Sequence, residues 1–196
     1  MTTQSEIKYN RLMEKAEELF TKIGYKAVSM DEIAEAAGIS KMTIYKHFSS
    51  KEELFIKVIL SILDRNTVML EEDMKKIPGT LKKIDHLMKY NVEMSRQYSL
   101  AFYKDIMGSP PIMEKVMKEK YRVSRVFFQK IITDGVRKGE IREVNVDFMT
   151  DMLIMLIGVF GDKYFDKITS KEEIEAATRD FYDFLKYGLL GEKEVE

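Results

Sequence analysis

Residues 29–51 contain two short helical segments separated by a glycine, and this pattern constrains the fold more than any other part of the chain. Ser29 and Glu32 are three residues apart, a spacing typical of a capping box at the start of a helix. Gly38 follows the apolar positions of this segment, where a left-handed residue commonly ends a helix and turns the chain. The sequence therefore predicts a helix over 30–37, followed by a sharp turn.

A second helix is predicted over 41–48 because Ser40 is a favourable N-cap residue. Ile44 and Phe48 are four residues apart, so both side chains can face inward. The other face carries side chains that can donate hydrogen bonds to phosphates or base edges: Lys41, Thr43, Tyr45, Lys46 and His47. Two helices joined in this way form a helix-turn-helix, whose second helix enters the major groove of DNA.

Two further features of this region support the helix-turn-helix. The small residues Ala34, Ala37 and Gly38 allow the two helices to approach closely where they cross. Another helix is expected to begin near Lys51, where the free amides of its first turn and the lysine predict a second phosphate contact. The motif therefore offers DNA contacts at both ends of its second helix.

Each of these side chains also has an ordinary structural explanation. Tyr45 could pack against the first helix of the motif with its hydroxyl in water, and a helical lysine is usually only solvated. Asp31 is better explained as a first-turn carboxylate that interacts with the helix dipole than as a base contact. We favour DNA binding because Lys41 and Lys46 fall on the same predicted surface as Lys51.

Residues 6–55 resemble the DNA-binding domain of the tetracycline-repressor (TetR) family. Residues 36–54 match the family motif and have the sequence Ala-Ala-Gly-Ile-Ser-Lys-Met-Thr-Ile-Tyr-Lys-His-Phe-Ser-Ser-Lys-Glu-Glu-Leu. The resemblance implies that phosphates are held by Ser29, Tyr45, His47 and Lys51, and that Lys41, Met42 and Thr43 lie nearest the bases. Ser40 and Lys46 complete the predicted DNA-binding set. Met42 departs from the glycine, alanine or proline of many members, and its thioether offers only apolar contact, for instance to a thymine methyl.

Composition permits this function without suggesting it. The chain has 196 residues, of which 45% are hydrophobic, and a formal net charge of −1. A sizeable core is therefore expected, and attraction to DNA must come from local charge. The absence of cysteine is consistent with a reducing cytosol. The N-terminus does not resemble a signal peptide, and the longest uncharged apolar run, 152–161, is too short to span a membrane, so we expect a soluble cytoplasmic protein.

Apolar periodicity predicts an all-α chain. Besides the helices of the motif, helices are expected over 5–23, 51–77, 81–95, 98–107, 111–138, 147–166 and 171–190, with turns at 108–110 and 135–145. We therefore predict an N-terminal three-helix domain, 1–50, that carries the helix-turn-helix, followed by an all-helical effector-binding and dimerisation domain, 51–196. No flexible linker separates them, so a shift in the second domain can tilt the first.

The C-terminal helices predict a homodimer. The segment 148–160 is apolar nearly all round, so it must be buried on more than one side. The last helix adds an apolar stripe of Ile174, Ala177, Phe181, Phe184 and Leu185. We expect these two helices from each of two chains to form a four-helix interface through about 147–190, as the TetR resemblance also implies. A two-fold dimer would place its recognition helices roughly 34–36 Å apart and select a palindromic operator.

Ten of the fourteen methionines lie between residues 69 and 155, with many aromatic residues nearby in sequence. Ordinary core packing is one explanation, and a pliable apolar pocket between helices is the other. The family resemblance favours a pocket for a small apolar or amphipathic effector that loosens DNA binding. The candidate ligand-binding residues are His86, Tyr90, Phe102, Tyr103, Met117, Tyr121, Met152 and Met155.

An enzyme is the rival class, but the chain has no cysteine nucleophile, nucleophile elbow, phosphate-binding glycine loop or His-Glu-x-x-His motif. We expect no cofactor and no metal. The sequence therefore indicates a dimeric transcriptional regulator, by resemblance a repressor that an effector releases from double-stranded operator DNA. The alternatives are a helical adaptor that binds protein partners and a DNA-binding regulator without a small-molecule effector.

Overall fold

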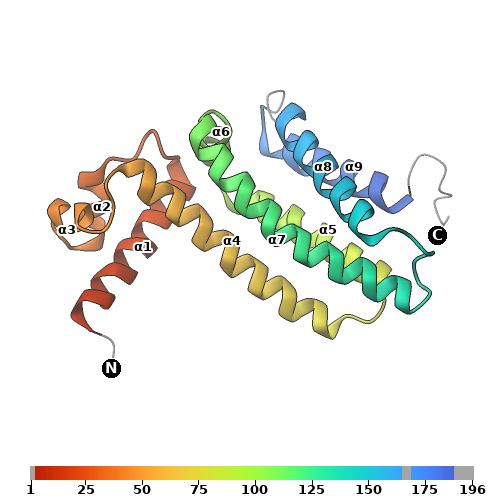
Figure 1. Cartoon of the computed structure of the whole chain (residues 1–196). Helices are drawn as coiled ribbons and strands as arrows, with labels where there is room; N and C mark the ends of the chain where they lie inside the picture. The colour runs from red at the N-terminus through yellow and green to blue at the C-terminus, as the bar shows by residue number, and fades with distance from the viewer. Residues whose placement is uncertain (1–2, 165–168, 188–196) are drawn as a thin grey trace. The chain divides into compact units, whose positions relative to one another are not determined.

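The computed structural model describes residues 3–164 and 169–187. Within these ranges every regular element is an α-helix, which confirms the all-α prediction (Figure 1). The helices are α1 (Gln4–Ile23), α2 (Met30–Ala37), α3 (Lys41–Tyr45), α4 (Lys51–Lys76), α5 (Thr80–Gln97), α6 (Leu100–Met107), α7 (Pro110–Arg137), α8 (Val146–Tyr164) and α9 (Lys171–Tyr187).

The helices pack into two compact units. The first comprises Met1–Arg65 and Tyr98–Glu119, and the second comprises Asn66–Gln97 and Lys120–Glu196. The long helices α4 and α7 each contribute to both units. The first unit therefore contains α6 and the beginning of α7 in addition to the helix-turn-helix. Packing units and functional domains are different divisions, so the predicted functional boundary between residues 50 and 51 stays a prediction.

The core of the first unit joins α1, α2 and α3 to the beginning of α4 and to α6. Leu12, Phe20, Ile33, Ile44 and Phe55 are completely buried in it. The ring of Phe55 contacts that of Phe20, with centroids 5.0 Å apart, and stacks on that of Tyr25 at 4.8 Å. Burial of such large apolar side chains supplies most of the driving force for folding. The helix-turn-helix is therefore held by long-range packing, since α2 and α3 are too short to be stable alone.

In the second unit, α9 packs along α5. The buried side chains of Met74, Leu87 and Tyr182 form its cluster. Asn91 of α5 donates one hydrogen bond of 2.8 Å to the Tyr182 hydroxyl and another of 2.8 Å to the Leu87 carbonyl. Burial raises the pKa of Tyr182 well above its ordinary value.

Most helix boundaries agree with the sequence-based predictions, but two differ. The predicted helix 41–48 ends at Tyr45, with a turn at residues 46–47. The helix α7 continues through Gly135, which the sequence placed both in the predicted helix 111–138 and in a turn over 135–145. A side chain at Gly135 would approach the Thr80 hydroxyl to 2.8 Å and the Ile141 side chain to 2.7 Å, so close packing explains this glycine. The predicted ends at 166 and 190 lie outside the described residues.

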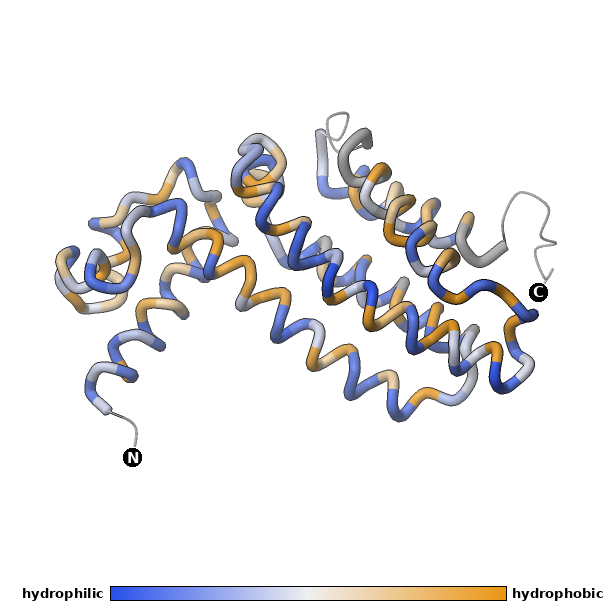
Figure 2. The backbone as a smooth tube through the Cα atoms, viewed as in Figure 1, coloured by the Kyte–Doolittle hydropathy of each residue, from blue (hydrophilic) through white to orange (hydrophobic). Residues whose placement is uncertain are grey.

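Hydrophobic residues recur along much of α8 (Figure 2). Despite this, no helix within the described ranges combines the length and the apolar character needed to cross a membrane.

Candidate DNA-binding site

The first helix of the motif, α2, is built as the sequence predicts. The Ser29 hydroxyl accepts a hydrogen bond of 3.2 Å from the Glu32 amide, and the Glu32 carboxylate accepts one of 2.7 Å from the Ser29 amide. These bonds hold the pKa of Glu32 below its usual range. At the other end of α2, Gly38 adopts the left-handed conformation with φ 60° and ψ 41°. Both local signals are therefore confirmed.

The turn after α2 has a partner that the sequence analysis missed. The Arg11 guanidinium, on α1, donates a hydrogen bond of 3.1 Å to the Gly38 carbonyl. This carbonyl belongs to the turn itself, so the bond ties α1 to the helix-turn-helix at its bend. Arg11 and Gly38 are 27 residues apart, and no periodic pattern in the sequence connects them.

The second helix, α3, begins at the predicted N-cap. The Ser40 hydroxyl accepts a hydrogen bond of 3.1 Å from the Thr43 amide. Ile44 and Phe48 are both buried, as their spacing predicts. The chain remains coiled beyond the end of α3, because the Phe48 amide donates to the Ile44 carbonyl at 3.0 Å. The buried positions therefore keep the same face inward over 41–48 although the regular helix is shorter.

The opposite face of α3 and the following turn is exposed. The exposed fractions of Met42 and Tyr45 are 73% and 48%, and Lys46 and His47 are exposed beside them. The His47 ring meets the Tyr9 ring edge-on, with centroids 5.3 Å apart, which orients the imidazole from α1. Seven of the nine predicted DNA-binding residues are exposed: Ser29, Ser40, Lys41, Met42, Tyr45, Lys46 and His47. These seven side chains are therefore accessible to solvent, and their contact with DNA stays a prediction.

Thr43 and Lys51, the other two predicted residues, are half-buried. The Lys51 ammonium donates hydrogen bonds of 2.8 Å to the carbonyls of Tyr25 and Val28, and it lies 4.3 Å from the centre of the Tyr25 ring. The sequence analysis expected Lys51 to bind phosphate. The structure also gives it internal partners, because the chain between α1 and α2 presents two carbonyls to the start of α4, and the phosphate contact stays a prediction.

The start of α4 also has hydrogen bonds within the chain. The Glu53 carboxylate accepts hydrogen bonds of 2.6 Å from both the amide and the hydroxyl of Ser49, while the Ser50 hydroxyl accepts one of 3.1 Å from the Glu53 amide. These contacts hold the pKa of Glu53 below its usual range. Of the first-turn amides of α4, that of Glu53 is therefore already bound by the Ser50 hydroxyl, while the Glu53 carboxylate binds the Ser49 amide just before the helix.

A second contact missed by the sequence analysis joins α6 to the chain between α1 and α2. The Asp105 carboxylate is buried and accepts a hydrogen bond of 3.0 Å from the Lys26 amide. Gly24, which ends α1, packs so closely that a Cβ atom there would lie 2.8 Å from the Asp105 carboxylate and 2.9 Å from the Ala101 methyl. The segment 24–28 is therefore contacted by Lys51 from one helix and by Asp105 from another.

The predicted ligand-binding residues divide between the two units. Phe102, Tyr103 and Met117 belong to the first unit, and the other five belong to the second. Phe102 is 3% exposed and its ring contacts that of Phe55, with centroids 5.7 Å apart, so core packing accounts for it. Burial raises the pKa of the neighbouring Tyr103. These positions favour the packing explanation that the sequence left open.

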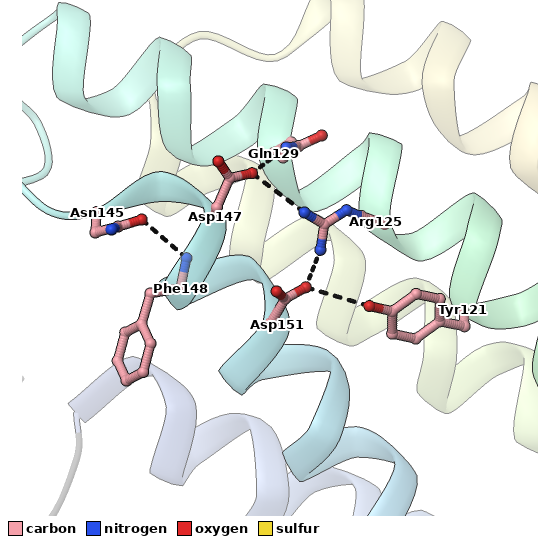
Figure 3. Close-up of polar contacts among 7 residues, drawn as sticks. All are labelled: Tyr121, Arg125, Gln129, Asn145, Asp147, Phe148 and Asp151. Atoms are coloured by element: carbon pink, nitrogen blue, oxygen red, sulfur yellow. Dashed lines mark hydrogen bonds and ion pairs between the residues drawn. The ribbon is translucent and has the colours of Figure 1, made fainter.

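In the second unit, Tyr121 and Met155 face solvent, with exposed fractions of 44% and 53%. The Tyr121 hydroxyl donates to the Asp151 carboxylate at 3.3 Å, beside the ion pairs that Arg125 of α7 makes with Asp147 and Asp151 of α8 (Figure 3). Tyr121 therefore belongs to a polar network between α7 and α8, and a ligand-binding role for Tyr121 or Met155 stays a prediction. His86 lies with its Nε2 atom 3.3 Å from the Asp73 carboxylate.

Known proteins share both the motif and the fold. Residues 12–58 match the family described as "Bacterial regulatory proteins, tetR family". The HTH-type transcriptional regulator UidR of Escherichia coli K12 is 27% identical over 167 residues, which cover 83% of this chain and 84% of UidR. These matches are to transcriptional regulators, not to enzymes.

Solved structures agree with these matches. The TetR-family regulator PfmR of Thermus thermophilus is 25% identical, with a TM-score of 0.57 over 91% of this chain and 98% of PfmR. The fold also matches FadR of Bacillus subtilis, solved with stearoyl-CoA, at 19% identity and a TM-score of 0.67 over 92% of this chain and 99% of FadR. A TetR helix-turn-helix at the N-terminus followed by a helical C-terminal part places this chain in the TetR family of transcriptional regulators.

Proposed function

We propose that the chain is a dimeric repressor that binds a palindromic operator and leaves it when a small apolar or amphipathic effector binds. The observation that carries the DNA-binding part is the row of exposed side chains on α3 and the turn after it, opposite the buried Ile44 and Phe48. A rigid helix that presents polar and apolar side chains on its open face suits the major groove. This surface is therefore assigned to the operator.

Individual roles follow from position and exposure. Lys41, Met42 and Thr43 form the first turn of α3, the part of a recognition helix that contacts base edges. Tyr45, Lys46 and His47 come later and have donors suited to phosphates, as do Ser29 and Ser40 at the two N-caps. Met42 contributes apolar contact to a thymine methyl. An ammonium has three N–H donors, so Lys51 can still offer one to a phosphate while it holds Tyr25 and Val28.

The dimer is supported by the outer face of α8. Arg125 pairs with Asp147 and Asp151, so this side of α8 faces α7. Phe148 and Val159 are 60% and 57% exposed, and the Phe148 side chain points away from the polar network (Figure 3). With the equally exposed Met155, they recur at intervals of seven and four residues along one face of the helix. Such an exposed apolar face indicates an interface.

The second predicted interface helix needs a correction. Ile174 of α9 is only 2% exposed within its own chain, and Phe181 packs against the cluster that contains Leu87. These two residues therefore serve the core of the second unit. Phe184, 42% exposed, remains available to a partner, whereas the side chain of Leu185 lies outside the described residues.

A charge on the outer face of α8 tests the dimer. Val159→Glu is expected to convert the dimer to a monomer in sedimentation at micromolar concentration, because a buried unpaired carboxylate would oppose association. Val68→Glu is the matched control, since Val68 on α4 is 60% exposed and lies outside the proposed interface. A wild-type monomer at this concentration, or equal behaviour of both variants, would refute the interface.

The effector proposal rests on chemistry and on a structural relative. Methionine and aromatic side chains between residues 69 and 155 suit a flexible apolar ligand. FadR of Bacillus subtilis, which shares the fold, was solved with stearoyl-CoA. We therefore include long-chain acyl-CoA thioesters, amphipathic molecules with an apolar tail, among the first compounds to test.

One experiment tests the whole proposal. Selection from random duplexes should return a palindrome, and titration of the bound palindrome with stearoyl-CoA and other apolar compounds should release the protein. Linkage requires the operator to weaken effector binding by the same factor. Failure to select any sequence would refute operator binding, and equal effector affinity with and without operator would refute the switch.

A further inference from the structure

Asp31 and Lys41 form an ion pair between the first turns of α2 and α3. The Lys41 Nζ atom lies 2.8 Å from the Asp31 carboxylate, and the side chains are 46% and 71% exposed. The hydrogen bond that the Lys41 ammonium donates to the Asp31 carboxylate raises the pKa of Lys41. The pair thus joins the beginning of the recognition helix to the helix that supports it.

The start of α2 does not depend on Asp31 for capping. Ser29 and Glu32 already satisfy each other's amides in the capping box. An exposed ion pair also contributes little to folding free energy. The arrangement of Asp31 is therefore more significant for what it does to Lys41 than for the stability of α2.

A second contact holds the neighbouring polar side chain. The hydroxyls of Ser40 and Thr43 share a hydrogen bond of 2.8 Å. Both Lys41 and Thr43 are therefore oriented before DNA arrives, on either side of the exposed Met42. Prior orientation lowers the entropy lost on binding and favours contacts that need a defined direction.

We propose that Asp31 is a specificity-determining residue, an inference that rests on the proposed operator binding. Its carboxylate restrains Lys41 from reaching the nearest phosphate and directs the ammonium to a base edge. The pair presents an acceptor beside a donor, which matches a guanine·cytosine pair: Lys41 donates to guanine O6 or N7, and Asp31 accepts from cytosine N4. The ion pair therefore limits nonspecific affinity and selects this base pair.

Alanine variants of two acids on α2 separate this role from general charge repulsion. Asp31→Ala removes the partner of Lys41, while Glu35→Ala removes the same charge one turn further along the exposed side of α2. Four variants, Asp31→Ala, Glu35→Ala, Lys41→Ala and the double variant Asp31→Ala/Lys41→Ala, would each be titrated with a non-operator duplex over a range of salt concentrations. Selection from random duplexes would then give the base preferences, and circular dichroism would verify the fold.

Asp31→Ala is expected to tighten nonspecific binding more than Glu35→Ala does. The slope of the logarithm of the binding constant against the logarithm of the salt concentration should also become steeper by about 0.9 for each bound subunit, because the released lysine contacts a phosphate. The guanine·cytosine preference nearest Lys41 should fall about fivefold or more, the lower limit for a lost base contact. Glu35→Ala should keep both the slope and the preference, and the double variant should lose no more preference than Lys41→Ala.

Equal slopes and preferences for Asp31→Ala and Glu35→Ala would overturn the inference, as would additive losses in the double variant. If the wild-type chain selects no sequence at all, the proposed function fails and the inference fails with it. If the wild type selects an operator that Asp31→Ala selects equally well, only the inference fails. The two failures are therefore distinguishable.

Discussion

The Lys51 ammonium donates a hydrogen bond of 2.8 Å to the main-chain carbonyl of Val28, the residue just before the N-cap of α2. Lys51 is the first residue of α4, so this bond connects the start of the long helix directly to the helix-turn-helix. A change in the direction of α4 would therefore act on the backbone that leads into α2. The contact offers a physical route by which the helical part of the chain can affect DNA binding.

Replacing Lys51 by methionine should destabilise the chain because the apolar stem is kept while the hydrogen bonds to Tyr25 and Val28 are lost. We expect the free energy of unfolding to fall by about 2 kcal/mol in urea denaturation, as for charge-assisted hydrogen bonds. Lys57→Met, at an exposed position on α4, is the matched control and should change stability by less than about 0.5 kcal/mol.

The same variant tests whether the third N–H of Lys51 holds a phosphate. Binding to all duplexes should weaken. If a phosphate contact is lost, the slope of the logarithm of the binding constant against the logarithm of the salt concentration should become shallower by about 0.9 per subunit. Weaker binding with an unchanged salt dependence would indicate that Lys51 only positions the segment between α1 and α2 and does not contact a phosphate.

Tyr45→Phe should weaken DNA binding without altering stability. The hydroxyl is on a side chain that is 48% exposed, and a lost hydrogen bond corresponds to about 0.5–1.5 kcal/mol. Because no charge changes, the salt dependence should stay the same, and the loss should be equal for every sequence. Fluorescence anisotropy would measure it, with Tyr121→Phe as the control from α7. Unchanged affinity for Tyr45→Phe would contradict the phosphate role.

Asp105→Ala should lower both stability and operator affinity although Asp105 is not among the proposed DNA contacts. The variant leaves the Lys26 amide without its acceptor, at a cost of about 1–3 kcal/mol in the free energy of unfolding. Asp105→Asn keeps an acceptor oxygen and should lose less. Lys26→Ala should have little effect, because the Lys26 side chain is 73% exposed and its ammonium lies 3.7 Å from the carboxylate. Equal operator affinity for the wild type and Asp105→Ala would show that the contact from α6 does not affect DNA binding.

Stability should decrease in acid partly through Glu140. Its carboxylate accepts hydrogen bonds of 2.6 Å from the amide and hydroxyl of Thr80, which hold the pKa of Glu140 below its ordinary value. The contribution is thus complete above the ordinary carboxyl pKa and disappears as the pH falls through the lowered one. The difference in unfolding free energy between wild type and Glu140→Gln should therefore shrink from pH 7 to pH 3. Glu114→Gln, at an exposed site on α7, should show no such convergence.

The local elements of the motif could be predicted because their partners are close in sequence. Ser29 with Glu32, the left-handed Gly38, and Ser40 with Thr43 each act within one turn of chain. Such signals determine where helices begin and end almost without help from the rest of the molecule. The length of α3 was overestimated: the helix ends at Tyr45, although the Phe48 amide still donates to the Ile44 carbonyl and the Phe48 side chain still faces inward.

The sequence by itself therefore determined that the chain is helical, that it carries a helix-turn-helix, and most of the side chains that this motif exposes. Only the tertiary structure decided the long-range contacts: the Lys41 ammonium meets the Asp31 carboxylate, the Lys51 ammonium meets the Val28 carbonyl, and the Lys26 amide meets the Asp105 carboxylate. It also decided which face of the apolar helix α8 remains uncovered. The reason is physical, because caps and turns depend on neighbouring backbone groups, whereas these contacts depend on how separate helices pack, and sequence spacing carries no record of that.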